Sequence, residues 1–217
     1  SLPLAISKLI AARRVHGKNQ DVQRVFKAGL LFGLVAGGLM TLFLLFGADW
    51  ITVHIFNSPN SALPLKVMAP TILVFSVMGV VRGYFQGLGN MVPTSISQVI
   101  EQVVNAVISV AASFAFMHWF ANRETPAAYG AAGGTLGTLS GALAAFVFLT
   151  LLMFVYRRQN TKALRKPQAD RLESWSHVYT ALFLTLTPII LSQFVYQLSG
   201  SVDNSMFGFL MSGKGLT

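Results

Sequence analysis

At 217 residues the chain could hold one or two soluble domains, but 53% of its residues are hydrophobic and only 11% are charged. With a mean hydropathy of +0.60, this composition indicates a helical membrane protein instead. The sequence has no cysteine and its four histidines stand far apart, which excludes disulfides and argues against metal-centred chemistry.

The net charge of +9 could suggest a nucleic-acid partner, yet the basic residues gather between apolar runs. Membrane topology explains this distribution better, so we expect the lipid bilayer and no nucleic acid as a partner. The chain opens inside an apolar segment without an initiator methionine and stops in a loop-like stretch at residues 212–217. We therefore expect a fragment of a longer protein.

Apolar segments predict the helices, because about 20 mostly apolar residues are needed to cross the hydrocarbon core. We expect a single all-α transmembrane domain over residues 1–217, a polytopic bundle. Its predicted spans are residues 2–10 (truncated), 28–48, 66–86, 92–117, 131–155 and 178–200.

Lysine and arginine concentrate in two predicted loops, residues 11–27 and 156–177, which should therefore face the cytoplasm. The four complete spans between these loops agree, since an even number of crossings returns the chain to the same side. Trp50, Trp119 and Trp175 fall at predicted membrane interfaces.

Small residues recur at four-residue spacing in spans 28–48 and 131–155. Such rows let helix backbones approach closely in lipid, so they predict a compact bundle and not a site. The rows are Gly29, Gly33 and Gly37 in the first span, and Gly133, Gly137, Gly141 and Ala145 in the second.

Span 66–86 contains Pro70 and ends near Arg82. Pro70, like Pro188 in span 178–200, is either a hinge or an inert bend. A helix-end arginine such as Arg82 either snorkels to headgroups or binds an anionic headgroup, because guanidinium suits phosphate. Lys8 and Arg13 share this ambiguity at the inner mouth of the truncated span, where they could attract the headgroup.

Span 92–117 has polar residues at three- and four-residue steps, which predicts one polar helix face. An ionised Glu101 near mid-membrane would cost about 2.5 kcal/mol or more on insertion scales, so it must face protein, water or a cation. The face either lines a substrate cavity or fixes helix packing through a protonated or arginine-paired Glu101. Its members are Thr94, Gln98, Glu101 or Gln102, Asn105 and Ser109.

Span 178–200 repeats this pattern more weakly, with Gln193 and Gln197 on one face and Asp203 near the outer end. We assign these three residues to the same hypothetical cavity. No phosphate-binding glycine loop or nucleophile elbow occurs, so enzymatic activity is not expected.

The sequence also carries longer motifs: VRGYFQG at residues 81–87, VPT at 92–94 and SQVIEQ at 97–102. These motifs resemble the polysaccharide-transporter branch of the multidrug/oligosaccharidyl-lipid/polysaccharide exporter superfamily, more narrowly the stage V sporulation protein B and lipid II flippase group. Supporting stretches are residues 2–9, 130–138 and 202–204.

The resemblance implies a bacterial plasma-membrane protein of about fourteen helices in two lobes around a central cavity, of which this chain would hold roughly the second to the seventh helix. The C-terminal lobe would then be a partner absent from this chain. Relatives often place an arginine four residues after the glutamate of the third motif, whereas this chain has Asn105. That departure weakens the expectation of a pyrophosphate-binding cation there.

The function that the resemblance implies is export of an undecaprenyl-linked saccharide, such as lipid II, by alternating access. No cofactor is expected, but Glu101 or Asp203 could bind a coupling sodium ion or proton. Two alternatives stay open: a multidrug or toxin cation antiporter of the same superfamily, and a membrane-embedded glycosyltransferase or acyltransferase.

Overall fold

The computed structural model describes residues 2–54, 62–120, 126–160 and 172–213, with the backbone alone for residues 126 and 201–213. These residues form the helices α1 (Leu2–Val15), α2 (Asn19–His54), α3 (Ala62–Gly87), α4 (Val92–Trp119), α5 (Pro126–Gln159) and α7 (Trp175–Gly213), and contain no strand. All of these helices except α1 are long and apolar enough to cross a membrane. The prediction of an all-α polytopic bundle is confirmed.

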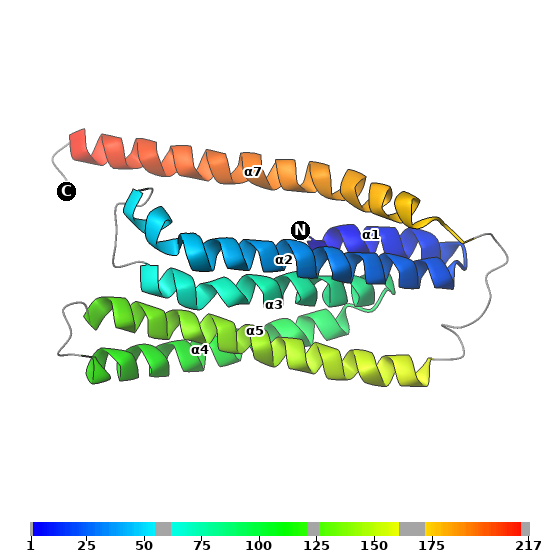
Figure 1. The fold of residues 1–217 in the computed structure, drawn as a ribbon, viewed down its shortest axis with the longest axis horizontal. Coiled ribbons are helices and arrows are strands. Elements are labelled where there is room, and N and C mark those ends of the chain that lie inside the picture. The colour runs from blue at the N-terminus through cyan, green and yellow to red at the C-terminus, as the bar shows by residue number, and fades with distance from the viewer. Residues whose placement is uncertain (1, 55–61, 121–125, 161–171, 214–217) are drawn as a thin grey trace.

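The helices lie side by side with roughly aligned axes (Figure 1). α3 is central, packing against α1, α2 and α5, while α4 packs mainly against α5. α7 lies along α1 and α2, on the side of the bundle opposite α4 and α5. We call the end that holds the α1–α2 corner, the α3–α4 turn and the start of α7 the inner end, because it carries the predicted cytoplasmic segments.

The basic segment 11–27, expected as a loop, is mostly helical. α1 continues to Val15 and α2 begins at Asn19, so a turn at residues 16–18 is the only break. Gly17 makes this turn with a left-handed φ of +69°, which glycine adopts without steric cost. Alanine, arginine, lysine and glutamine favour helix, so a basic segment at a membrane surface need not be a loop. The second basic segment falls partly on residues 161–171, outside the described part of the chain.

Glycines set the distance between neighbouring helices. A Cβ atom added at Gly37 of α2 would lie 2.7 Å from the Ser76 hydroxyl of α3, and one at Gly133 of α5 would lie 2.5 Å from the Ala112 carbonyl oxygen of α4. Close approach of this kind gives the dispersion contacts that hold membrane helices together. The two glycine rows therefore sit in helix contacts.

A third glycine row, on α3, was not singled out from the sequence. A Cβ at Gly83 would lie 2.7 Å from the Pro3 carbonyl oxygen, and one at Gly87 would lie 2.9 Å from the Ser7 carbonyl oxygen. Its four-residue spacing is the same as in the other rows, so the signal was present. This row lets α1 pack tightly on α3.

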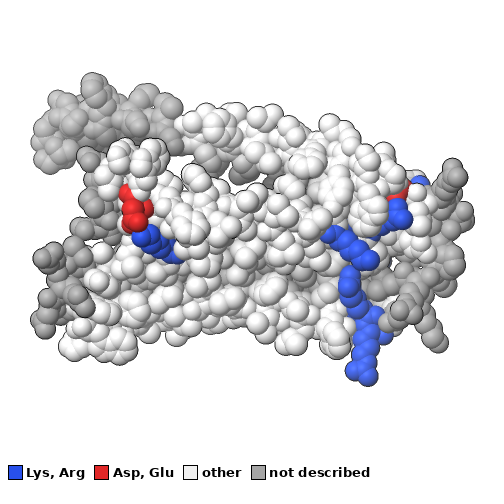
Figure 2. Space-filling view, in the orientation of Figure 1, with Lys and Arg blue, Asp and Glu red and all other residues white. Residues whose placement is uncertain are grey.

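On the face shown in Figure 2, charged groups lie toward the two ends, with a broad uncharged band between them. Large apolar side chains of the long helices are exposed, including Phe46 at 84% exposure and Phe114 at 77%. Such a surface suits hydrocarbon, since lipid tails do not penalise apolar exposure. Pro70 and Pro188 lie inside continuous helices, α3 and α7, and their role as hinges stays a prediction.

We expect Gly133→Ala to lower the free energy of unfolding by about 1–3 kcal/mol, the usual range for overpacking. The added methyl group would meet backbone atoms of Ala112 and Ser113, which cannot rotate away. Gly38→Ala is the matched control, because a Cβ there meets nothing within 4 Å. Unfolding of the full-length protein in mixed micelles measures both. Equal stability of the two variants would contradict the packing role.

Candidate functional site

A buried ion pair joins α3 to α4 near their inner ends. The Arg82 Nη2 atom donates to Glu101 Oε2 at 2.8 Å, and both side chains are nearly covered, at 11% and 12% exposure. Arg82 Nε also donates to the Ser97 hydroxyl at 3.0 Å. The alternative in which Glu101 pairs with an arginine is therefore what the structure contains. The pair resolves the cost of a lone charge in the membrane, because each charge neutralises the other.

The α3–α4 turn positions the two partners of this ion pair. Gly89 takes a left-handed φ of +75°, and the Asn90 amide donates back to the Phe85 carbonyl at 3.0 Å. Asn90 Oδ1 then accepts from the Val92 amide at 3.1 Å, just before α4 begins. A short turn of this kind sets the register between two antiparallel helices. It places Arg82 level with the second and third turns of α4.

The predicted polar face of α4 is divided in two. Thr94 accepts from Gln86 of α3 at 3.3 Å, and the single Ser109 hydroxyl lies 2.8 Å from both the Gly134 carbonyl oxygen of α5 and Asn105 Oδ1, which share its proton. Gln98 and Gln102, in contrast, are exposed. Thus part of the row makes helix contacts, while the two glutamines form a polar strip on the free surface of α4.

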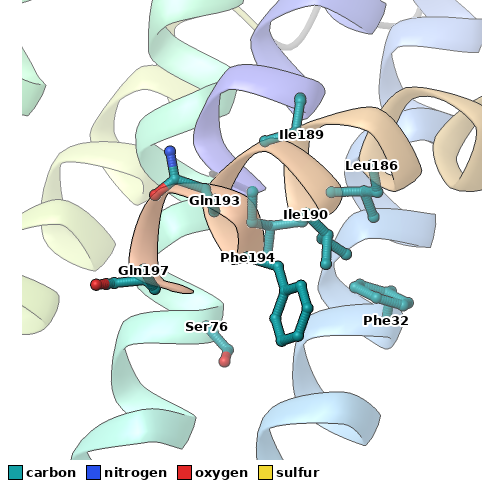
Figure 3. Close-up of a pocket in the computed structure, with 9 residues that line it drawn as sticks. Phe32, Ser76, Leu186, Ile189, Ile190, Gln193, Phe194 and Gln197 are labelled. Atoms are coloured by element: carbon teal, nitrogen blue, oxygen red, sulfur yellow. The ribbon is translucent and has the colours of Figure 1, made fainter. Parts of the chain in front are cut away.

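The glutamines of α7 belong to a different place. Gln193 and Gln197 line a largely apolar pocket of about 500 Å³ beside Ser76 of α3 and Phe32 of α2 (Figure 3). Most residues that line this pocket belong to α7, which lies on the side of the bundle opposite α4 (Figure 1). The structure therefore does not bring the α4 and α7 residues of the predicted cavity together. The side chain of Asp203 lies outside the described part of the chain.

At the inner end, Lys8 is exposed but Arg13 is buried in an ion pair. Arg13 Nη2 donates to Glu173 Oε2 at 2.6 Å, and its Nε donates to the same oxygen at 3.2 Å. The Glu173 amide donates to Asp21 Oδ1 at 3.1 Å, and its carbonyl accepts from Arg24. We call Arg13, Asp21, Arg24 and Glu173 the inner clasp. Sequence reasoning missed it, since its two halves lie about 150 residues apart.

A second polar chain connects α2, α3 and α5 at the same end. The buried Tyr84 hydroxyl accepts from Gln23 Nε2 at 3.0 Å, and Gln23 Oε1 accepts from Arg157 Nη2 at 3.1 Å. The Arg157 guanidinium also lies 5.1 Å from the centre of the Phe26 ring, a cation–π geometry. These contacts fasten the inner end of the bundle around α3.

No group of three or more metal-binding side chains occurs in the described part of the chain. Of the two carboxylates predicted to bind a coupling ion, only the side chain of Glu101 lies in the described part of the chain. Its negative charge is already matched by Arg82. A coupling ion at Glu101 or Asp203 stays a prediction.

The sequence of this chain matches one known protein family over nearly its whole length. Residues 2–216 match the family described as polysaccharide biosynthesis protein. The chain belongs to this family. The match covers nearly the whole sequence, including all the helices described above.

Two individual proteins are also similar to this chain. The chain is 29% identical to stage V sporulation protein B of Bacillus subtilis (strain 168), over 91% of this chain and 36% of that protein. It is 26% identical to the lipid II flippase MurJ of the same organism, over 98% of this chain and 40% of that protein. This family member thus spans well under half the length of these relatives. The predicted resemblance and the prediction of a multi-pass plasma-membrane protein are confirmed; no solved structure matches.

We expect that removing one partner of the Arg82–Glu101 ion pair lowers the free energy of unfolding by about 3 kcal/mol, because the other charge is left nearly covered and unpaired. Arg82→Met and Glu101→Leu should each show this loss. The double variant should be more stable than either single variant, since no buried charge then remains. Unfolding in mixed micelles completes the double-mutant cycle, and simple addition of the two losses would contradict the pairing.

The inner clasp predicts a loss of stability in acid. Burial alone would raise the pKa of Glu173, but hydrogen bonds from Arg13 and His177 and their charges outweigh it and lower the pKa below its usual value of 4.5. A lowered carboxyl pKa contributes stability that is complete above about pH 4.5 and is lost as the pH falls through the folded-state pKa.

Unfolding measured across this acidic range should therefore show a steeper decline for the parent than for Glu173→Gln, which has no carboxyl group to protonate. Asp49→Asn is the control, because the Asp49–Lys66 pair is exposed, at 69% and 39%. It should keep the acid dependence of the parent. Identical slopes for the parent and Glu173→Gln would refute the contribution of the clasp.

Proposed function

We propose that this chain is part of a flippase that moves an undecaprenyl-linked saccharide, with lipid II as the favoured cargo, across the bacterial plasma membrane by alternating access. One observation carries the proposal: Arg82, inside the apolar helix α3, is nearly covered and is held by Glu101 and Ser97 of α4. Family membership and the relatives described above support the transport class. The proposal includes no catalytic step.

Arg82 is the proposed contact for the anionic diphosphate of the cargo. Its guanidinium is held by Ser97 and Glu101, so the group is oriented before any ligand arrives. Guanidinium binds phosphate oxygens in a two-pronged geometry, which a lysine cannot reproduce. A phosphate would compete with Glu101 for Arg82, and release of Glu101 would leave that carboxylate free for a coupling sodium ion or proton.

The exposed strip of Gln98 and Gln102 on α4 is the proposed wall for the sugar groups. Amide side chains offer both donors and acceptors, as sugar hydroxyls require. Two amides facing only hydrocarbon would be costly, which favours a hydrated or protein-covered surface. In this proposal, that surface is completed by helices of the longer protein, including a second lobe, while the lipid tail stays in the bilayer.

Lys8 and Arg13 have different parts in the proposal. Lys8 is exposed at the inner end and is suited to attract the headgroup. Arg13 is engaged by Glu173, so its contribution to headgroup attraction would require the inner clasp to open.

Translocation of fluorescent lipid II by the full-length protein in proteoliposomes tests the function. We expect Arg82→Ala to lower the rate at least tenfold and Arg82→Lys to recover only part of it, because lysine keeps the charge but not the geometry. The Arg82→Met/Glu101→Leu double variant should be folded yet inactive. Asp49→Asn, at the opposite end of the bundle, should transport at the parental rate.

Two results would overturn the proposal. Full transport by the folded double variant would remove Arg82 from the cargo path. Failure of the parent to move lipid II, together with export of amphipathic cations in the same vesicles, would assign the protein to drug efflux instead.

A further inference from the structure

Glu173 stands just before α7 and connects it to two other helices. Its carboxylate binds Arg13 of α1, and its backbone binds Asp21 and Arg24 of α2. The Arg24 guanidinium also lies 5.3 Å from the centre of the Trp175 ring, at the first residue of α7. Four separate contacts therefore converge on Glu173 and Trp175, where the chain enters this helix.

The clasp is more buried than an ordinary surface ion pair. Asp21 is fully covered, and the side chains of Arg13 and Glu173 are 8% and 18% exposed. Exposed pairs usually contribute little because water screens them, whereas loss of one partner from a covered pair leaves an unmatched charge. Strong electrostatic contacts are thus concentrated where the chain enters α7.

The contacts of α7 change along its length. Val178, Leu182 and Leu186 of the inner half are buried at 0%, 1% and 4% exposure, in the shared hydrophobic core. Ile189 still packs against this core, but every residue from 190 to 200 is exposed. The pocket of Figure 3 lies beside this outer half, next to α2 and α3. Among the described residues, α7 is thus fastened to the bundle by its inner half.

We propose that the inner clasp is the anchor of α7: it holds the start of this helix on the α1–α2 corner. The anchor is a property of this fold and holds for any transported molecule. In this proposal, Val178 and Leu182 reach their buried positions only when the clasp holds the start of α7 against α1 and α2. Opening the clasp should release the inner end.

Spin-label distance measurements on the full-length protein in nanodiscs test this anchor. The 217 residues contain no cysteine, and any cysteine elsewhere in the full-length protein is replaced by serine. Val15→Cys and Ser176→Cys, both at exposed positions, then place one label on α1 and one on α7. The parent should give one narrow distance distribution. Arg13→Glu and Glu173→Arg, each tested alone, should broaden it, because each places like charges together.

The combination Arg13→Glu/Glu173→Arg restores opposite charges and should narrow the distribution again, which a general folding defect would not do. If a single charge reversal fails to fold, Glu173→Gln replaces it, with broadening again expected. Asp49→Asn is the matched control at the outer end and should leave the distribution unchanged. Single variants as narrow as the parent, or a double variant as broad as the single ones, would overturn the proposal.

Discussion

Close backbone contact between helices is the constraint on which the rest of this structure depends. In a bilayer, burial of apolar side chains gives little drive for helix association, because lipid is as apolar as leucine. The bundle instead places glycines where helices meet, as at Gly37 against Ser76, Gly83 against Pro3 and Gly133 against Ala112. α3 takes part in two of these contacts, so its position, and with it the position of Arg82, is fixed from both sides.

The tight packing determines where polar groups can be accommodated. α4 is held against α5 through the Gly133, Gly137 and Gly141 row, and its contact with α3 is concentrated in polar side chains near the turn. The Arg82–Glu101 pair therefore does two things at once: it cancels two charges in a low-dielectric layer and connects α4 to the centre of the bundle. A ligand that captures Arg82 would also loosen this connection, which gives headgroup binding a direct way to change the packing of α4.

The sequence was sufficient for the number and order of the helices and for two of the glycine rows, because length, hydropathy and spacing are local properties; it missed the helical ends of α1 and α2 within residues 11–27. It was not sufficient for the division of the α4 polar row. A four-residue step advances about 40° beyond a full turn, so Gln102 stands about 80° away from Thr94. Only the positions of α3 and α5 decide that Thr94 and Glu101 are covered while Gln98 and Gln102 are free. The clasp was equally out of reach, since Arg13 and Glu173 are separated by 160 positions and neither sits in a local pattern.

The separation of the α4 and α7 polar groups bears on the size of the transport unit. Gln98 and Gln102 face outward on one side of the bundle, and Gln193 and Gln197 line a pocket on the other. A single cavity lined by both groups cannot be closed by the described helices alone. Under the proposed function, the strip on α4 and the pocket beside α7 would each be completed by other parts of a longer protein, in keeping with relatives of which this chain covers 36–40%. The clasp at the start of α7 would then fix one boundary of that assembly.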